Sequence, residues 1–353
     1  MDLMRCDLKL ISLSPHVSQI VTGFLMLQKM KIVDLNINFV PEHAANYPTP
    51  HMIEAVIDNK IKISYDMLDG YNFANQNIDN YLKGIDCYFK RSYNLNYHQD
   101  FAYSARIFPL GFNYHVTTKG NILDYKLGKF SMRNAAALLY RNIVFGRRLN
   151  AFHTDHFEDM PHIDNETLVL FLTRPWDPEE DPNFSAGLKE ERHYINNMRV
   201  SCIRKLREVF GSRFIGGFSP LPYAIERFPD CVVDGISTKR YNFLQIVKKA
   251  SICVATMGLH ESNGWRLAEY IAASKAIVSE KLHYSVPGNF NCNENYLEFN
   301  NADQCVEQAM KLDGDKQLAY KMKLNNYYYY HNYLRPDRLV FNTLVVAFNH
   351  PTQ

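Results

Sequence analysis

Segments of strand length alternate with segments of helix period along most of this 353-residue chain, and the alternation runs through twice. In the first run, residues 7–13 read as a strand, residues 16–31 place apolar side chains at helical spacing, and residues 32–40 alternate again. Further strands are expected at residues 54–66, 86–90 and 106–110, and further helices at residues 78–84 and 131–145. Such alternation favours a parallel sheet covered by helices.

A polar and irregular stretch at residues 146–165 interrupts the pattern and is the best linker candidate. The second run then predicts strands at residues 167–173, 214–218, 251–255, 276–280 and 296–299, and helices at residues 190–210, 242–250, 264–273, 302–311 and 317–328. We therefore expect an α/β protein with two Rossmann-like domains facing across a cleft. The expected parts are an N-terminal domain at residues 1–160, a C-terminal domain at 161–334 and a closing helix at 335–353.

Composition narrows the function classes. The formal net charge of +2, from 39 Lys and Arg against 37 Asp and Glu, does not predict nucleic-acid binding. Peripheral contact with an anionic membrane surface stays open. The seven cysteines form no C-x-x-C pair, which favours a reducing compartment. No apolar run approaches the roughly 20 residues of a membrane span, and no signal peptide is evident, so we expect a cytoplasmic protein.

The window at residues 251–280 carries the strongest chemical signal, because it reads strand, loop, helix, strand. Its loop and the start of its helix contain the expected donor-binding residues Gly258, Ser262, Asn263, Gly264 and Trp265. A helix N-terminus at the carboxyl end of a parallel strand attracts anions, since free N–H groups and the helix dipole point there. Small residues let a phosphate approach the backbone, so the window predicts a diphosphate site.

Two glutamates frame that helix, Glu261 before it and Glu269 in its second turn. A carboxylate accepts two hydrogen bonds from a vicinal diol, so each could hold sugar hydroxyls. The E-x7-E spacing in this context resembles the donor motif of retaining GT-B glycosyltransferases of the family 4 type. The resemblance implies that Glu261 acts on the donor sugar as a catalytic residue and that Glu269 holds the nucleotide ribose. It also implies hexosyl transfer, whereas the residues themselves leave retention and inversion open.

Two segments depart from that family pattern. Asn263-Gly264-Trp265 stands where an aromatic residue and a glycine usually follow the first glutamate, and Ser14-Pro15-His16 replaces a Gly-Gly loop after the first strand.

Basic side chains should offset the diphosphate charge, because GT-B enzymes usually do so without a metal. Arg174 follows the first strand of the second run, where relatives carry a Gly-Arg pair. Lys239 and Arg240 precede the helix that leads into the window, and Arg266 lies in the donor helix itself. We expect these cations to bind the donor, with no metal and no cofactor beyond the nucleotide-sugar substrate.

The first run supplies the acceptor-side candidates. D-G-Y-N at residues 69–72 and F-K-R-S-Y at residues 89–93 resemble stretches of bacterial surface-polysaccharide glycosyltransferases, which implies polysaccharide or glycoconjugate biosynthesis. His16 and Asp69 are candidates for general base, and Asn113 and His115 for acceptor contact.

Other site types lack their main signals. The cluster His153, Asp155, His156 and Asp159 fits a linker better than a metal site. G-x-G-x-x-G, the P-loop pattern and G-x-S-x-G are absent, which disfavours dinucleotide oxidoreductases, P-loop kinases and α/β-hydrolases. The expected reaction moves a sugar from a nucleotide-sugar donor to a hydroxyl of a glycan or glycolipid. Two alternatives stay open, a nucleotide-sugar 2-epimerase and a non-catalytic sugar-nucleotide-binding subunit.

Overall fold

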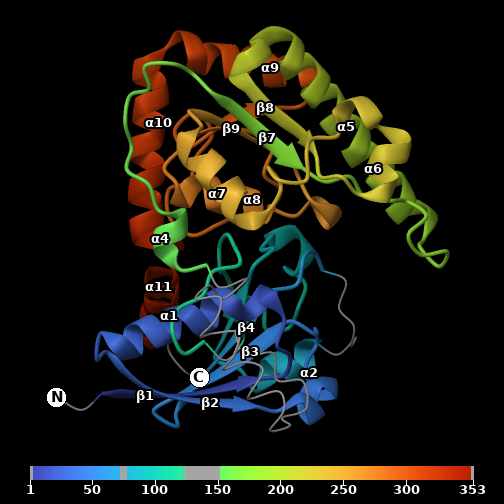
Figure 1. Cartoon of the computed structure of the whole chain (residues 1–353). Helices are drawn as coiled ribbons and strands as arrows, with labels where there is room; N and C mark the ends of the chain where they lie inside the picture. Colours follow the sequence, from blue (N-terminus) through green and yellow to red (C-terminus); the bar gives the residue numbers. More distant parts are fainter. Residues whose placement is uncertain (1–2, 72–77, 122, 124–151, 351–353) are drawn as a thin grey trace, which may run out of the picture.

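The computed structural model describes residues 3–71, 78–121, 123 and 152–350. Two α/β domains lie one above the other in Figure 1, and each is built on its own sheet. The predicted architecture, two Rossmann-like α/β domains facing across a cleft, is confirmed. No helix in the described part of the chain is long and apolar enough to cross a membrane. The helix expected at residues 131–145 lies outside the described residues.

Within the described ranges, the first sheet has six strands in the order β2-β1-β3-β4-β5-β6. Their bounds are Met4–Leu10 (β1), Val33–Phe39 (β2), Met52–Ile57 (β3), Ile61–Asp66 (β4), Cys87–Lys90 (β5) and Ile107–Pro109 (β6). The accompanying helices are α1 (Ser18–Lys29) and α2 (Ile78–Lys83). The apolar face of α1 shares one core with β1, β3 and β4, as its helical spacing predicts.

The first sheet is mixed, so the expectation of a parallel sheet is wrong for its centre. Residues 54–66, taken as a single strand signal, form the antiparallel pair β3 and β4, and β3 also runs antiparallel to β1. The turn between them places Asp58 and Asn59 at φ values of 48° and 56°. Asp and Asn tolerate this left-handed conformation better than other side chains, and it is the conformation that a tight hairpin needs.

The second sheet, which lies entirely within residues 152–350, has five parallel strands in the order β11-β10-β9-β7-β8. Their bounds are Val169–Thr173 (β7), Phe214–Phe218 (β8), Ile252–Ala255 (β9), Ala276–Glu280 (β10) and Leu297–Phe299 (β11). Strands β8 and β10 coincide with the predicted ranges. A parallel sheet is buried on both faces, which makes its strands short continuous apolar runs that are easy to recognise.

Helices cover both faces of this second sheet (Figure 1). They are α5 (Ala186–Phe210), α6 (Pro222–Arg227), α7 (Arg240–Lys249), α8 (Trp265–Ala272), α9 (Ala302–Gly314) and α10 (Lys316–Tyr329). Helices α5 and α9 share a core on one face, and α7 and α8 share the core on the other. Because the strands of this sheet are parallel, their carboxyl ends all lie at the same edge of the sheet, the edge beside the cleft.

After α10 the chain returns to the first domain. A π-helical turn at Tyr330–Leu334 leads into α11 (Pro336–Asn349), which packs along α1 (Figure 1). The approach is close: a side-chain carbon on Gly23 would lie 2.3 Å from the carbonyl oxygen of Pro336. The hydroxyls of Tyr65 and Thr343 also lie 2.8 Å apart. Helix α11 thus completes the core of a domain whose strands lie some 300 residues earlier in the chain, as the partners in these contacts show.

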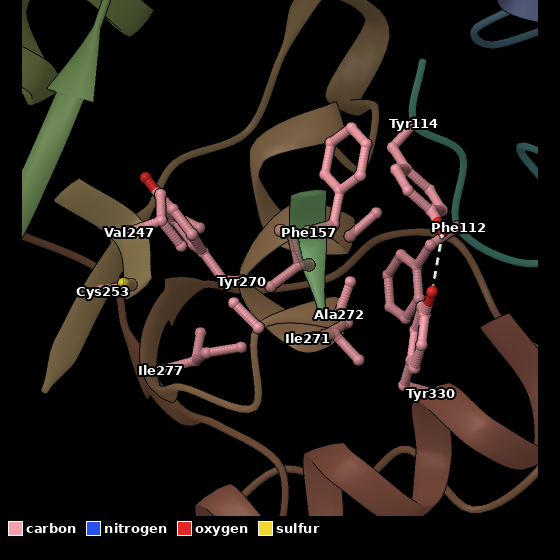
Figure 2. Packing of buried hydrophobic residues seen from close by; sticks show 14 of the residues in the cluster. Phe112, Tyr114, Phe157, Val247, Cys253, Tyr270, Ile271, Ala272, Ile277 and Tyr330 are labelled. Carbon is pink, nitrogen blue, oxygen red and sulfur yellow. Dashed lines mark hydrogen bonds between the residues drawn. The ribbon is translucent and has the colours of Figure 1, made fainter. Parts of the chain in front are cut away.

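A segment of the first run packs into the core of the second domain. Figure 2 shows Phe112 and Tyr114, which follow β6, beside Phe157 and Tyr330, in the same buried cluster as Tyr270 and Ile271 of the second domain. The hydroxyls of Tyr114 and Tyr330 lie 3.3 Å apart. The two domains are therefore joined by a buried apolar contact, and the cleft opens beside it.

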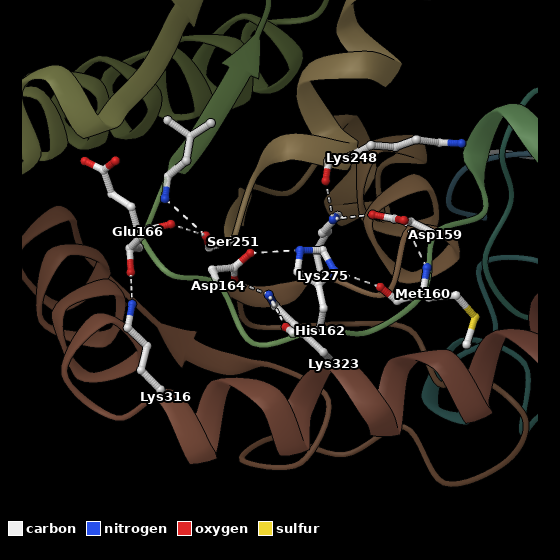
Figure 3. A network of polar contacts seen from close by, with 12 residues as sticks. Asp159, Met160, His162, Asp164, Glu166, Lys248, Ser251, Lys275, Lys316 and Lys323 are labelled. Atoms are coloured by element: carbon white, nitrogen blue, oxygen red, sulfur yellow. Dashed lines mark hydrogen bonds and ion pairs between the residues drawn. The ribbon is translucent and has the colours of Figure 1, made fainter.

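The described part of the predicted linker, residues 152–165, is held against the second domain by buried lysines (Figure 3). It contains one short helix, α4 (Thr154–Phe157). Lys275 Nζ lies 2.8 Å from Asp159 Oδ2, and its side chain is only 1% exposed. Lys323 pairs with Asp164 in the same way. A buried charge is costly unless it is paired, so these ion pairs fix the path of the linker.

Candidate functional site

A cavity of about 680 Å³ lies between the domains, at the carboxyl ends of β7 and β9. Ten of the residues predicted from the sequence line it: His16, Asp69, Arg174, Arg240, Gly258, Ser262, Gly264, Trp265, Arg266 and Glu269. Five predicted residues lie outside its lining: Glu261, Lys239, Asn263, Asn113 and His115. Both tryptophans of the chain, Trp176 and Trp265, are in the lining. The structure therefore gathers most of the expected donor site around one space.

The loop at residues 258–264, hereafter the donor loop, folds back on itself between β9 and α8. The N–H of Gly258 donates to the carbonyl of Ser262 across 2.9 Å. Any side-chain carbon on Gly258 would meet Ser262 Oγ at 2.6 Å, so the position suits glycine. Gly264 is the N-cap of α8, and no side chain caps it. The first N–H groups of α8 are thus left for a ligand in the cavity.

Glu269 is buried on the cavity side of α8 and is neutralised by two arginines. Its side chain is 1% exposed, and its Oε2 accepts a hydrogen bond of 3.1 Å from Arg266 Nη1. Its Oε1 lies 2.6 Å from Arg240 Nη1, an ion pair without hydrogen-bond geometry, so this buried oxygen accepts no hydrogen bond from the described residues. A hydroxyl that displaced Arg240 from this oxygen would find an acceptor there.

Arg174 and Trp176 follow β7 and line the same cavity. The guanidinium of Arg174 lies over the Trp176 ring, 4.0 Å from its centroid, which fixes the cation without consuming its hydrogen-bond donors. The backbone of Trp176 is clamped by Asn196, which accepts from the Trp176 N–H at 2.8 Å and donates to its carbonyl at 2.6 Å. This part of the lining is therefore a pre-arranged cationic surface.

Arg199, on α5, is a lining residue that sequence reasoning missed. Its guanidinium donates to the carbonyls of Arg174 at 2.6 Å and Met257 at 2.8 Å, and to Thr256 Oγ1 at 2.9 Å. It thereby ties the loops after β7 and β9 together. The available signal was a charged residue at helical spacing from the apolar Ile195 and Ile203 of α5.

Glu261 occupies an unusual backbone conformation. His260 and Glu261 have φ values of 58° and 56°, which are rare for residues with side chains and occur where surrounding contacts enforce them. The N–H of His260 donates to Glu191 Oε1 at 2.5 Å, and its carbonyl accepts from Tyr284 at 2.7 Å. The Glu261 side chain is 45% exposed, with Oε1 3.5 Å from His283 Nδ1. Its predicted action on the sugar stays a prediction.

The other predicted residues outside the lining lie in different surroundings. Lys239 is exposed just before α7. Asn263 donates to the Tyr284 carbonyl, and Asn113 is buried with its amide nitrogen 3.0 Å from the His16 carbonyl oxygen. The ring of His115 lies 6.1 Å from that of Trp265. Asn113 and His115 thus sit behind His16 and Trp265.

Two histidines lie together on the first-domain side of the cavity. The rings of His16 and His51 stack with centroids 4.6 Å apart, and Trp265 meets His16 edge-on at 5.0 Å. Burial, with a smaller contribution from the nearby Arg91 guanidinium, lowers the pKa of His16 to about 4. Burial also lowers the pKa of His51. These two imidazoles are therefore uncharged near neutral pH, next to the ion pair of Arg91 and Asp69. Nothing in the local sequence marks His51 as part of the site.

The histidine and aspartate cluster before β7 is not assembled as a metal site. Asp159 pairs with Lys275, and His156 faces Asp155 at 3.0 Å. Among the described residues, no three His, Cys, Asp or Glu side chains converge as metal ligands do.

Comparison with known proteins gives fold-level likeness at low identity. No family model matches the chain, and no curated protein matches it. A glycosyltransferase from Rickettsia africae ESF-5 is 13% identical, with a TM-score of 0.45 over 93% of this chain and 80% of that one. TarM is 12% identical, with a TM-score of 0.47 over 92% of this chain and 57% of that one. Anabaena HepE, solved in complex with UDP, is 11% identical, with a TM-score of 0.34 over 92% and 88% of the two chains. A function for this chain therefore has to be argued from the residues that line its own cavity.

Proposed function

We propose that this protein is a glycosyltransferase that takes a sugar from a nucleoside-diphosphate sugar and transfers it to a hydroxyl of a glycan or glycolipid, in polysaccharide or glycoconjugate biosynthesis. One observation carries the proposal: the cavity between the domains is lined by arginines beside the uncapped N-terminus of α8. These arginines are Arg91, Arg174, Arg199, Arg240 and Arg266.

The charge of the cavity suits a diphosphate. The lining holds only two carboxylates, Asp69 and Glu269, against the five arginines, so a dianion would be attracted to it. Arg174 and the N–H groups of α8 lie on the second-domain side, where an anion would meet both. Glu269 Oε1, which pairs with Arg240 but accepts no hydrogen bond from the described residues, supports a place for the ribose diol nearby.

Transfer requires one bond to break and one to form. The bond between the anomeric carbon and the diphosphate oxygen breaks, and a new bond forms from that carbon to the acceptor oxygen. The proposal places the acceptor on the first-domain side, against His16 and His51, and the departing diphosphate takes up the hydroxyl proton in a retaining reaction. Arginines and helix N–H groups would stabilise the charge that develops on the leaving group, without a metal.

The test is a binding and turnover screen. Calorimetric titration with uridine, guanosine and cytidine diphosphates should find at least one that binds with a Kd in the micromolar range, about −8 kcal/mol at 1 μM. The corresponding nucleotide-sugars should release diphosphate faster when a glycan or glycolipid acceptor is present. Binding with acceptor-independent interconversion of the sugar would mean an epimerase instead. Binding without any turnover would mean a sugar-nucleotide-binding subunit.

A further inference from the structure

Residues 91–94 of the first domain lie against the second domain at residues 263 and 283–285, and we call this contact the interdomain seam. Arg91 Nη2 donates to the carbonyl of Asn263 at 2.7 Å. Asn94 Nδ2 donates to the carbonyl of His283 at 3.1 Å, and the N–H of Ser285 donates to the carbonyl of Tyr93 at 2.8 Å. The seam therefore consists of directed polar contacts, and it reaches the last residues of the donor loop.

Arg91 is held firmly from the first-domain side. Its side chain is only 4% exposed, and Nη1 forms an ion pair with Asp69. Its backbone N–H donates to the carbonyl of Asp66 at 2.9 Å, at the carboxyl end of β4. Asp66 itself is buried, accepts from Tyr88 at 2.7 Å and pairs with Lys90 at 3.1 Å. A buried and fully hydrogen-bonded network of this kind is rigid.

The second-domain side of the seam is cross-linked to the donor loop. Asn263 donates to the carbonyl of Tyr284 at 3.3 Å, and the Tyr284 hydroxyl donates to the carbonyl of His260 at 2.7 Å. A displacement of residues 283–285 or of Asn263 should therefore also displace the rest of the donor loop. Arg91 touches this unit from the other domain and also lines the cavity.

We propose that Arg91 is a positioning residue of the transfer reaction, which holds the donor loop in register with the first domain. Asp69 orients the Arg91 guanidinium and is not the base that accepts the acceptor proton. The proposal rests on the proposed function and adds to it the residue that aligns donor and acceptor across the cleft. Two guanidinium arms are needed, one for Asp69 and one for Asn263, and a lysine ammonium offers a point charge in place of this fork. Misalignment of reacting groups costs rate more than ground-state binding.

Arg91→Lys tests this, with Arg106→Lys as the matched control. Arg106 is also a first-domain arginine that donates to backbone carbonyls, those of Leu82, Lys83 and Ile85, but it contacts no residue of the donor loop. In Arg91→Lys we expect kcat to fall at least about tenfold while the Kd of the best-bound nucleoside diphosphate changes less than about twofold. Arg106→Lys should leave the ratio of kcat to Kd unchanged. Equal losses of kcat and diphosphate affinity in Arg91→Lys would mean that Arg91 binds the diphosphate directly, and would overturn the proposal.

Hydrogen exchange tests the same contact without any turnover. Amides of residues 258–264 and 283–285 should exchange at least about tenfold faster in Arg91→Lys than in the unmodified protein, because the seam opens locally. Unchanged exchange there would overturn the positioning role even if the enzyme assignment stands. Conversely, the chain could show this faster exchange in Arg91→Lys and yet have no transferase activity in the unmodified protein. That result would support the contact between Arg91 and the donor loop and would overturn the proposed function.

The role of Asp69 is tested by Asp69→Asn. The amide oxygen still accepts from Arg91 but the charge of the ion pair is lost, so kcat should fall by about threefold to tenfold and the pH profile should keep its shape. A loss of about a hundredfold, together with loss of the acidic limb of the pH profile, would identify Asp69 as the base and overturn its assignment as the partner of Arg91.

Discussion

The carboxylate of Glu269 on α8 and the guanidinium of Arg240 on α7 approach to 2.6 Å, and this pair closes the second-domain wall of the cavity. With Arg266 on the other oxygen, the buried charge of Glu269 is already neutralised before any ligand arrives. A ribose diol would therefore meet a carboxylate whose position is fixed by two cations, which favours binding by lowering the entropy lost.

Glu269→Ala should weaken nucleoside-diphosphate binding at least about tenfold, or about 1.4 kcal/mol, because two hydrogen bonds to a charged acceptor are lost. Titration with the diphosphate and with its 2′,3′-dideoxy analogue measures this, and the preference for the ribose should disappear in the variant. The exposed Glu307 on α9 gives a control, Glu307→Ala. Tighter diphosphate binding by Glu269→Ala would mean that Glu269 only restrains the two arginines.

Glu261→Gln should lower kcat on the order of a hundredfold, or about 2.7 kcal/mol, and barely change diphosphate affinity. The reason is that a carboxylate near the sugar stabilises the positive charge that the sugar gains in the transition state. Turnover and diphosphate affinity are measured on the same variant. A near-normal kcat with a lowered melting temperature would leave Glu261 only a part in holding the strained donor loop.

Excess chelator should leave turnover within about twofold of the untreated rate, since the arginines and the N-terminus of α8 can carry the diphosphate charge. The assay compares initial rates with and without EDTA. Loss of activity that manganese or magnesium restores would show that the chemistry needs a metal.

The free energy of unfolding should decrease as the pH is lowered from about 6.5 to about 4, because of His16. Its pKa in the folded protein is about 4, below the ordinary value of 6.5, so the unfolded chain takes up the proton first as pH falls. The stabilisation is complete above pH 6.5 and is lost on acidification, and His51 acts in the same direction. Melting temperatures measured from pH 7.5 to pH 4 should fall less steeply for His16→Gln than for His43→Gln, a change at an exposed histidine. Parallel curves would exclude His16 as a source of the pH dependence.

Gly23→Ala should lower the free energy of unfolding by about 1–3 kcal/mol, because the new methyl group meets the Pro336 carbonyl and a Val340 methyl in a close-packed contact. Gly187→Ala on α5 is the matched control, since no atom lies within 4 Å of its added carbon. That control should be neutral or slightly stabilising. Equal effects of the two changes in denaturant titrations would contradict the tight docking of α11.

The sequence predicted the second domain better than the first. Parallel strands such as β8 and β10 are short apolar runs between clear breaks, so their ranges could be set to the residue. The hairpin of β3 and β4 was missed because its turn, Asp58-Asn59, lacks the glycine that usually marks such a turn.

The site residues also fall into those that the local sequence predicts and those that it does not. The donor loop and Glu269 are local in sequence and were predicted together, whereas Arg91 acts on Asn263, 172 residues away. His51 and Arg199 likewise take their meaning from neighbours on other elements. No window of the sequence contains those pairings, because they arise only when the domains are packed together.

The return of α11 to the first domain has a consequence for any attempt to divide the chain. In the described part of the chain, the second domain begins before β7 and the polypeptide returns to the first domain at Leu334–Pro336, so one cut before β7 leaves α11 attached to the wrong piece. A fragment that stops before α11 would expose the face of α1 around Gly23 and Phe24 that Val340 now covers. Such a fragment should aggregate unless α11 is supplied as a separate peptide. If that peptide restores the folded state, the chain could be used as a split protein whose folding depends on adding the peptide.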